Sequence, residues 1–469
     1  MSFSRFLTYL LLLLATLMPA CGGKEESVGE RMASLQEKEY EPAAYWEGFD
    51  EAAEEVRAML QKEAEVDLGG IPFRMADRPA MASAFASNLQ RQLHLIELEE
   101  EELESLGEML SVALLGIYDI SAKEVLVCKE NFPFLADLVS MPDLDALDCL
   151  KALMAHEGSH AVADLKWGLA ETIEELEDDQ QLEALSAVIE GYAQYMARKV
   201  CTENGLKDGF ETFTTAVGAS PETDDPVERL AMEAATATFS FQYYEGEDFV
   251  RAIVAARGEA AIGDLFTAPP RNATMIAKPE WYLDPSKIEE GSFDLPELLT
   301  TFEETTAAPG RSPNQVEMNL AAFRAAMAPL SEEVIDGILA LVVKNRMSVA
   351  VEAGGEVTAL VIYECRSDAD AASMAGYSEQ LLRARDEAFK EGPTRITAAS
   401  YTEFEASGWK GVRSVKTVAM PGGSLDATTF IAHRGVLSTE LTIAGHGVDV
   451  ELIEKAYAAL TEHAFDAAR

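Results

Sequence analysis

The sequence predicts an α+β protein, with a large, mostly helical domain that contains a short β-hairpin and a smaller α+β domain after it. Apolar residues recur at helical spacing through much of the first 300 residues. Two short strand-like segments near residue 120 interrupt this pattern. Beyond residue 330, strand-like segments alternate with two longer helical ones, which is typical of a sheet covered by helices.

The helical part is divided by residues that start or stop helices. Gly69-Gly70-Ile71-Pro72 breaks the chain after the first helix. Pro142 suits the first turn of a helix and Gly168 suits its end. The expected elements are helices over 45–62, 81–109 (as one or two segments), 142–167 and 182–200, and a hairpin with strands 116–119 and 124–127.

The second part begins after a stretch rich in Pro, Gly and Thr. Strands are expected near 347–351, 357–363, 412–419, 428–434 and 437–443, with helices over 367–389 and 450–463. The length of 469 residues suits two to three folded units. The predicted divisions are a signal peptide (1–20), a lipid-anchored tether (21–44), the helical domain (45–300), a linker (301–330) and the α+β domain (331–469).

The amino terminus predicts export and a lipid anchor. Arg5 precedes a mostly apolar run of twelve residues, which is too short to span a bilayer comfortably and fits a signal peptide. The run ends at Met18-Pro19-Ala20-Cys21, which resembles a bacterial lipobox and makes Cys21 the expected lipidation site. Gly22 after it favours the outer membrane of the cell envelope. Plain secretion with an incidental cysteine is the alternative.

Charge and cysteine content narrow the possible partners. The chain has 37 Lys and Arg against 82 Asp and Glu, a net charge of -45, which argues against binding to nucleic acid. It also argues against docking on anionic lipid through a basic patch. In an exported protein, one disulfide among Cys128, Cys149 and Cys201 is plausible, although its pairing cannot be deduced.

Residues 156–160 read His-Glu-Gly-Ser-His, an H-E-x-x-H motif within an expected helix. Positions four apart lie on one helical face, so His156 and His160 can bind one Zn²⁺. Glu157 lies beside them and can take a proton from a water on the metal. The alternative is a pair of ordinary core or surface histidines.

Zinc needs a third protein ligand, and the spacing of a third histidine in metzincins is absent here. Glu190 stands alone in an otherwise apolar stretch, where a buried carboxylate needs a partner. A metal is one candidate partner, and Arg198 or solvent is another. Other carboxylates remain possible ligands, but they crowd a polar connection: Glu171, Glu174, Glu175, Glu177, Asp178, Asp179 and Glu183.

Two supporting roles are also open. Asp164 lies one turn after His160 and can accept the second ring N–H of a ligating histidine, or it is an ordinary surface residue. Several tyrosines are candidates for stabilising an oxyanion, and the sequence does not choose among Tyr118, Tyr192, Tyr195, Tyr243 and Tyr244.

An ordered series of short motifs resembles the bacterial and archaeal zincin-like metallopeptidases of the gluzincin type. These motifs lie between residues 114 and 282, about a third of the chain. They are Gly116-Ile117-Tyr118-Asp119, His156 to Asp164, Glu190-Gly191-Tyr192-Ala193, Phe241 to Val250, Pro269-Pro270 and Pro279-Glu280-Trp281-Tyr282.

The resemblance implies a zinc-dependent peptidase with a mostly helical domain and Glu190 as the third ligand. It also implies that the hairpin is an edge strand along which an extended peptide lies. Two positions differ from the family. Gly158-Ser159 replaces a large apolar residue followed by a small one, and a glycine inside a helix costs about 1 kcal/mol relative to alanine. Lys278 stands where the family commonly has histidine.

Three functions therefore remain open from the sequence. The first is a zinc peptidase that hydrolyses peptides or proteins outside the cytoplasm through Glu157. The second is a catalytically silent zinc-binding envelope lipoprotein that acts as a scaffold or chaperone. The third is a structural lipoprotein whose histidines bind no metal. Other enzyme classes find little support, since G-x-S-x-G, P-loop and G-x-G-x-x-G motifs are missing.

Overall fold

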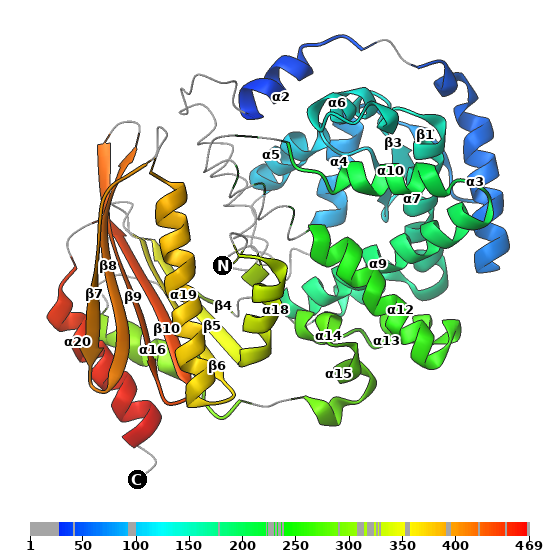
Figure 1. Cartoon of the computed structure of the whole chain (residues 1–469). Coiled ribbons are helices and arrows are strands. Elements are labelled where there is room, and N and C mark those ends of the chain that lie inside the picture. The colour runs from blue at the N-terminus through cyan, green and yellow to red at the C-terminus, as the bar shows by residue number, and fades with distance from the viewer. Residues whose placement is uncertain are drawn as a thin grey trace.

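The chain forms a helical part and a separate β-sheet part, as a computed structural model shows (Figure 1). This confirms the predicted α+β class with its two kinds of domain. The structure describes residues 28–466, except for 41–42, 92–99, 177–178, 289–290, 307–313, 352–356, 391–394, 421–422 and 446–447, and most positions of 222–238 and 317–329. The predicted signal peptide and Cys21 lie outside the described residues.

The helical part is built around two long helices, α7 and α9, which pack against each other. Its elements in order are α2 (Val28–Gln36), η2 (Ala44–Gly48), α3 (Phe49–Ala64), β1 (Phe73–Met75), α4 (Arg78–Gln90), α5 (Glu100–Ser111), β2 (Gly116–Asp119), β3 (Glu124–Val127), α6 (Asn131–Leu138), η3 (Pro142–Leu144), α7 (Leu147–Trp167), α8 (Leu169–Glu174), α9 (Asp179–Glu203), α10 (Lys207–Val217), η4 (Phe241–Glu245), α12 (Gly246–Arg257), η5 (Glu259–Ala261), α13 (Ile262–Thr267), α14 (Ala273–Ala277), α15 (Pro279–Leu283) and η6 (Pro285–Lys287).

Helix α7 is the centre of this part, and almost every side chain from Cys149 to Asp164 is buried. It begins at Leu147, later than the expected Pro142, which instead starts the short turn η3. Gly168 ends α7 with φ at 70°, in the left-handed region that favours glycine, so the predicted stop is confirmed.

The predicted hairpin is present, and it belongs to a three-stranded sheet of order β1-β3-β2. Strand β1, which the sequence analysis missed because it has three residues, runs parallel to β3. Strand β2 pairs antiparallel with β3 and forms one edge of this sheet. Elements α7 and α4 both contact β2, so the edge lies between the two helices.

The last part of the predicted tether is folded rather than flexible. Helix α2 contacts α6, and Asp137 at the end of α6 holds this segment. The Arg31 guanidinium donates to the Asp137 carbonyl at 2.8 Å, and Tyr40 donates to its carboxylate at 3.2 Å. Lys38 pairs with the same carboxylate. The described part of the segment predicted as a tether over 21–44 is therefore packed against α6.

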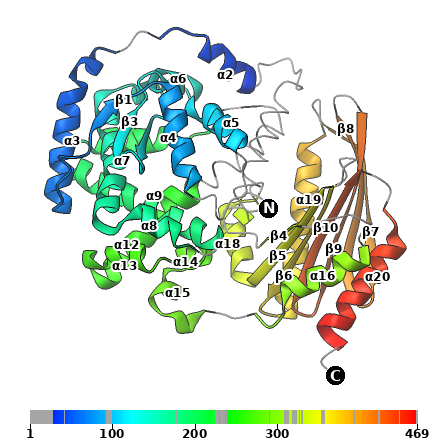
Figure 2. The ribbon, with the colours of Figure 1, turned by 180° about the vertical axis from the view of Figure 1, so that it is seen from behind.

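The sheet part contains one seven-stranded sheet of order β4-β5-β6-β10-β9-β8-β7, in which all neighbours are antiparallel. Helices α16 and α20 cover one face, while α19 crosses the other (Figures 1 and 2). The elements are α16 (Leu295–Thr306), β4 (Asn314–Val316), α18 (Glu332–Leu341), β5 (Val342–Val351), β6 (Val357–Cys365), α19 (Asp368–Ala388), β7 (Arg395–Ala406), β8 (Trp409–Met420), β9 (Gly423–Arg434), β10 (Leu437–Gly445), α20 (Val450–Thr461) and η7 (Glu462–Asp466).

The structure moves the predicted boundary between the two parts. Residue 300 falls inside α16, and Leu295, Leu298, Leu299 and Phe302 of this helix pack into the core of the sheet part. The linker predicted over 301–330 contains β4, which extends the sheet. Strand β7 was also missed, because its mostly exposed, polar residues lack the alternating apolar pattern of a half-buried strand.

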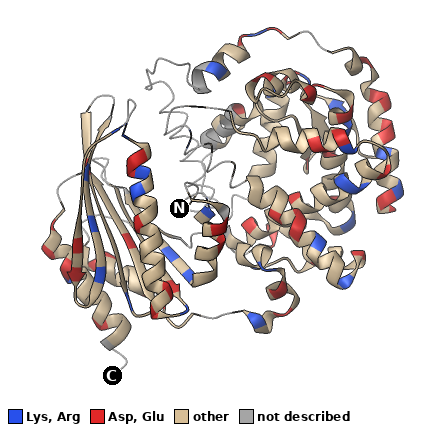
Figure 3. Cartoon of the chain, in the orientation of Figure 1, with Lys and Arg blue, Asp and Glu red and all other residues tan. Residues whose placement is uncertain are grey.

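Acidic residues are distributed over the helices of both parts (Figure 3). None of the described helices has the length and apolar character needed to cross a membrane.

Candidate metal centre

Three side chains converge where α7 and α9 meet. The Nε2 atom of His156 lies 3.2 Å from the Glu190 carboxylate oxygen Oε2 and 3.3 Å from Nε2 of His160. Nε2 of His160 lies 3.6 Å from the same Glu190 oxygen. Within the described residues, this is the one group of three such side chains that could hold a metal ion. All three sequence-predicted ligands are therefore brought together.

The surroundings of the three side chains favour the ionised form of the Glu190 carboxyl group. The His156 side chain is almost fully buried, whereas 22% of the Glu190 side chain is exposed. Burial raises the pKa of Glu190, but the neighbouring His160 and His156 outweigh this effect and hold it well below its usual value. Burial lowers the pKa of His160, yet Glu190 and Glu157 raise it overall.

Two glycines allow α9 to lie very close to the start of α12. A Cβ on Gly191 would lie 2.1 Å from the backbone carbonyl carbon of Gly246, and one on Gly246 would lie 2.1 Å from the Ala187 carbonyl oxygen. Helix α9 and the start of α12 therefore touch backbone to backbone. This close approach needs glycine at both positions and places η4 next to Glu190.

Gly158 has a packing role rather than a loosening one. A Cβ at this position would lie 2.5 Å from Cδ1 of Leu60 and 3.0 Å from Cζ of Phe73. Helix α7 continues unbroken through Gly158 to Trp167. The glycine lets α3 and β1 pack directly against α7, so the expected loosening of the helix is not found.

Glu157 lies beside the three-residue group and faces strand β2. The pKa of Glu157 is raised overall, because burial has the largest effect and the charge of Glu190 adds to it. The charges of His156 and His160 and the Tyr118 backbone N–H act in the opposite direction. A Cβ on Gly116 would lie 3.0 Å from the Glu157 Cγ, so the absence of a side chain on β2 makes room for this glutamate. Its carboxylate thus sits between the edge strand and the histidines.

Among the candidate tyrosines, Tyr243 is the one in the site. Its ring stacks on His156 at a centroid distance of 5.5 Å and on Phe239 at 4.1 Å. Burial, then the charges of Glu190 and Glu157 and a hydrogen bond to Glu190, raise its pKa well above the usual value. Tyr243 belongs to η4, a π-helical turn, and such turns are frequent at functional sites.

The other four tyrosines have different surroundings. The hydroxyl groups of Tyr118, Tyr195 and Tyr244 donate to Asp164, Glu259 and the Thr214 carbonyl. Tyr192 is buried between Trp167 and Phe266.

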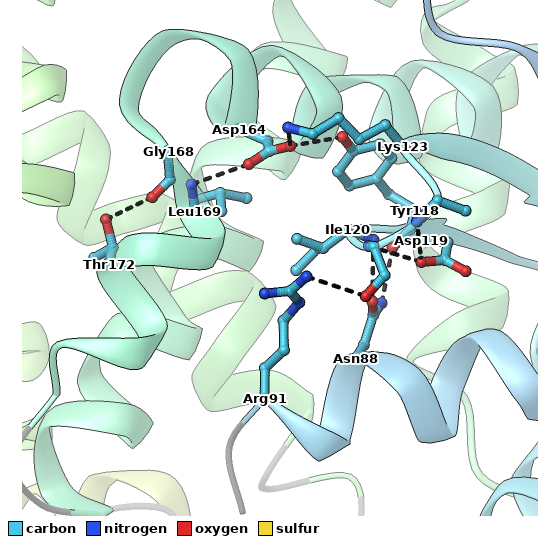
Figure 4. A network of polar contacts seen from close by, with 12 residues as sticks. Asn88, Arg91, Tyr118, Asp119, Ile120, Lys123, Asp164, Gly168, Leu169 and Thr172 are labelled. Atoms are coloured by element: carbon cyan, nitrogen blue, oxygen red, sulfur yellow. Dashed lines mark hydrogen bonds and ion pairs between the residues drawn. The ribbon is translucent and has the colours of Figure 1, made fainter. Parts of the chain in front are cut away.

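Asp164 does not take the role expected for it. Its Oδ2 accepts from the Tyr118 hydroxyl at 2.8 Å and from Lys123 at 2.9 Å, and its Oδ1 accepts from the Leu169 backbone N–H at 3.2 Å (Figure 4). The hairpin packs over this end of α7 and occupies the carboxylate. The buried Nδ1 of His156 has no hydrogen-bond partner within the described residues. Asp164 therefore anchors the hairpin rather than a metal-site histidine.

The remaining sequence alternatives are resolved by contacts. Arg198 pairs bidentately with Glu247, at 2.6 and 2.7 Å, and so is not the partner of Glu190. The ammonium group of Lys278 lies 4.5 Å from the Trp281 ring centroid, in the wall of a cavity between α9 and β5. The four cysteines in the described part of the chain are buried free thiols, so the expected disulfide is not formed: Cys128, Cys149, Cys201 and Cys365.

Comparisons with known proteins add little. No protein-family model and no curated protein matches the chain. A crystal structure from Chloroflexus aurantiacus, described as "a putative hydrolase with a novel fold", covers 56% of this chain and 97% of its own, at 19% identity and a TM-score of 0.36. A likeness of this size carries no argument about fold or activity, so the function has to be argued from the site itself.

Proposed function

We propose that this protein is a zinc-dependent peptidase, with His156, His160 and Glu190 as the metal ligands. The spacing of their three ligand atoms carries the proposal. Ligands at 2.0–2.2 Å from a tetrahedral zinc lie roughly 3.3–3.6 Å from one another. The separations here are 3.2, 3.3 and 3.6 Å. Two imidazoles and one carboxylate form a common ligand set of catalytic zinc, which keeps a fourth position open.

Glu157 and Tyr243 have positions that suit peptide hydrolysis. Zinc, when bound, would polarise the peptide carbonyl and increase the acidity of a water molecule. The Glu157 carboxylate lies next to the ligands and can take the proton of the attacking water, then deliver it to the leaving amine. The Tyr243 ring stacks on His156, so its hydroxyl belongs to this site and can donate a hydrogen bond to the developing oxyanion.

Metal content and hydrolysis test the proposal together. Purified wild type should contain one zinc, and Glu190→Ala should lose it, whereas Glu203→Ala, at an exposed position of the same helix, should keep it. Glu157→Gln should retain zinc and lose cleavage of a mixed peptide library. A wild type without zinc would refute the metal site. Zinc retention with no Glu157-dependent cleavage would favour the scaffold function and refute the peptidase.

We also propose that the protein works at the cell envelope, anchored through a lipid on Cys21. This part rests on the sequence around Met18 to Cys21. Mass spectrometry of the amino-terminal peptide should find a diacylglyceryl group on Cys21, and Cys21→Ser should release the protein from the membrane fraction. An unmodified Cys21 would refute the anchor without affecting the peptidase proposal.

A further inference from the structure

The outward edge of β2 is the place where an extended peptide could pair with the sheet. The Leu115 carbonyl accepts from the Cys128 N–H of the next strand, so Leu115 and every second residue after it point towards β3. Val125 and Val127 bond in the other direction, to Pro72 and Ala76. It follows that the backbone groups of residues 116, 118 and 120 face away from the sheet.

Two of these outward groups are already bonded. The Asn88 side chain, at the end of α4, donates from Nδ2 to the Tyr118 carbonyl at 2.8 Å and accepts at Oδ1 from the Ile120 N–H at 3.0 Å (Figure 4). These are the bonds that a neighbouring strand would make to residues i and i+2. Asn88 therefore occupies the edge of β2 in place of a third strand.

The open stretch of the edge is short and lies beside Glu157. The first outward residue, Gly116, lies against the Glu157 side chain, since a Cβ at this position would be 3.0 Å from the Glu157 Cγ. No hydrogen bond involving the outward groups of Gly116 is present within the described residues. An incoming peptide can thus pair at Gly116, but beyond Tyr118 it meets Asn88 and α4.

We propose that Asn88 is a specificity-determining residue that restricts this site to peptides cleaved close to their amino terminus. The inference rests on the proposed peptidase function and narrows its substrate class. Antiparallel pairing is the more stable arrangement per residue. In that direction the carboxyl-terminal side of the substrate runs past Gly116. Its amino-terminal side runs towards Ile120, where Asn88 leaves room for about two residues.

Arg91, directly after α4, contacts the turn of the hairpin. Its guanidinium donates to the Ser121 hydroxyl at 3.2 Å and to the Glu174 carboxylate at 2.7 Å. Ser121 belongs to the turn of the hairpin. This makes Arg91→Gln a matched control for Asn88→Ala, since both shorten a polar side chain at the end of the same helix region.

The test is to map cleavage positions in a random peptide library by mass spectrometry. Wild type should cut within about two residues of the amino terminus and tolerate any length after the cut. Asn88→Ala should shift cleavage towards internal bonds by about tenfold relative to terminal ones, and Arg91→Gln should not. Equal cleavage of internal bonds by wild type, or a limit on the carboxyl-terminal side, would overturn the inference.

A binding measurement keeps the inference testable if Asn88→Ala folds poorly. In the Glu157→Gln background, three residues added before the preferred cleavage site should weaken peptide binding about tenfold in calorimetry. Three residues added after that site should not. Equal affinities for the two extensions would refute the role of Asn88. A wild type that cleaves no peptide of any length would instead refute the proposed function.

Discussion

Replacing Asp164 distinguishes two possible roles of its carboxylate, which are to orient His160 at the metal site or to anchor the hairpin. If Asp164 oriented His160, its loss would lower zinc affinity about 10–100-fold. The structure instead gives Asp164 three partners in and near the hairpin: Tyr118, Lys123 and the Leu169 N–H. We therefore expect Asp164→Ala to lower stability and to leave zinc affinity within a few-fold of wild type.

The expected loss of stability in Asp164→Ala follows from the buried groups that lose their hydrogen-bond partner. The Tyr118 hydroxyl and the Leu169 N–H are bonded to a carboxylate with 1% of its side chain exposed. Each buried donor without a partner costs about 1–3 kcal/mol. The Lys123 side chain is 54% exposed, so its ammonium group returns to solvent at little cost. The total of about 2–6 kcal/mol corresponds to a fall in Tm on the order of 5–20 °C.

Calorimetry and zinc titration measure the two effects on the same samples. Tyr118→Phe should lower stability less than Asp164→Ala, because it removes one partner and leaves Lys123 and Leu169 in place. Glu174→Ala, which breaks an exposed pair with Arg91, should change stability by less than about 0.5 kcal/mol. A zinc affinity that falls more than tenfold in Asp164→Ala, at unchanged stability, would refute this reasoning.

Tyr243→Phe should lower kcat about 10²–10³-fold, because it removes one hydrogen-bond donor to the oxyanion, and should change zinc affinity little. Steady-state kinetics and metal titration measure the two effects. An unchanged kcat would exclude that role. Gly158→Ala should destabilise the protein by about 1 kcal/mol, as measured by urea unfolding. Overpacking against Leu60 costs about 1–3 kcal/mol, and the higher helix propensity of alanine offsets about 1 kcal/mol of this cost. Gly376→Ala, in α19 with open space around the new Cβ, should stabilise by about 1 kcal/mol; equal effects at both glycines would contradict the packing argument.

The local elements were predictable wherever a residue pattern determines them. The i and i+4 spacing of His156 and His160 places both on one face of any helix that contains them, and Gly168 ends that helix. The hairpin was also predictable, because two apolar segments flank a short polar turn. Elements with weak patterns were missed: the three residues of β1 and the exposed strand β7.

Which distant residues meet was not determined by these patterns. Glu190 was one of several carboxylates that could have approached the histidines, and Arg198 or solvent remained an alternative partner for it. The packing of α9 against α7 decides the question, because it places the Glu190 carboxylate 3.2 Å from His156. The close contact of Gly191 with Gly246 brings η4 beside α9. That contact selects Tyr243, which lies in η4, from five candidate tyrosines.

By itself, the sequence determined the helical motif that presents two histidines and a glutamate, together with the order of helices and strands around it. Periodicity, caps and turn residues act over a few positions, so a single chain segment is enough to specify them. Tertiary structure alone decided that Asp164 holds the hairpin and that Asn88 occupies the edge of β2. These side chains bond to groups 30 or more residues away, and such pairings depend on how whole elements pack.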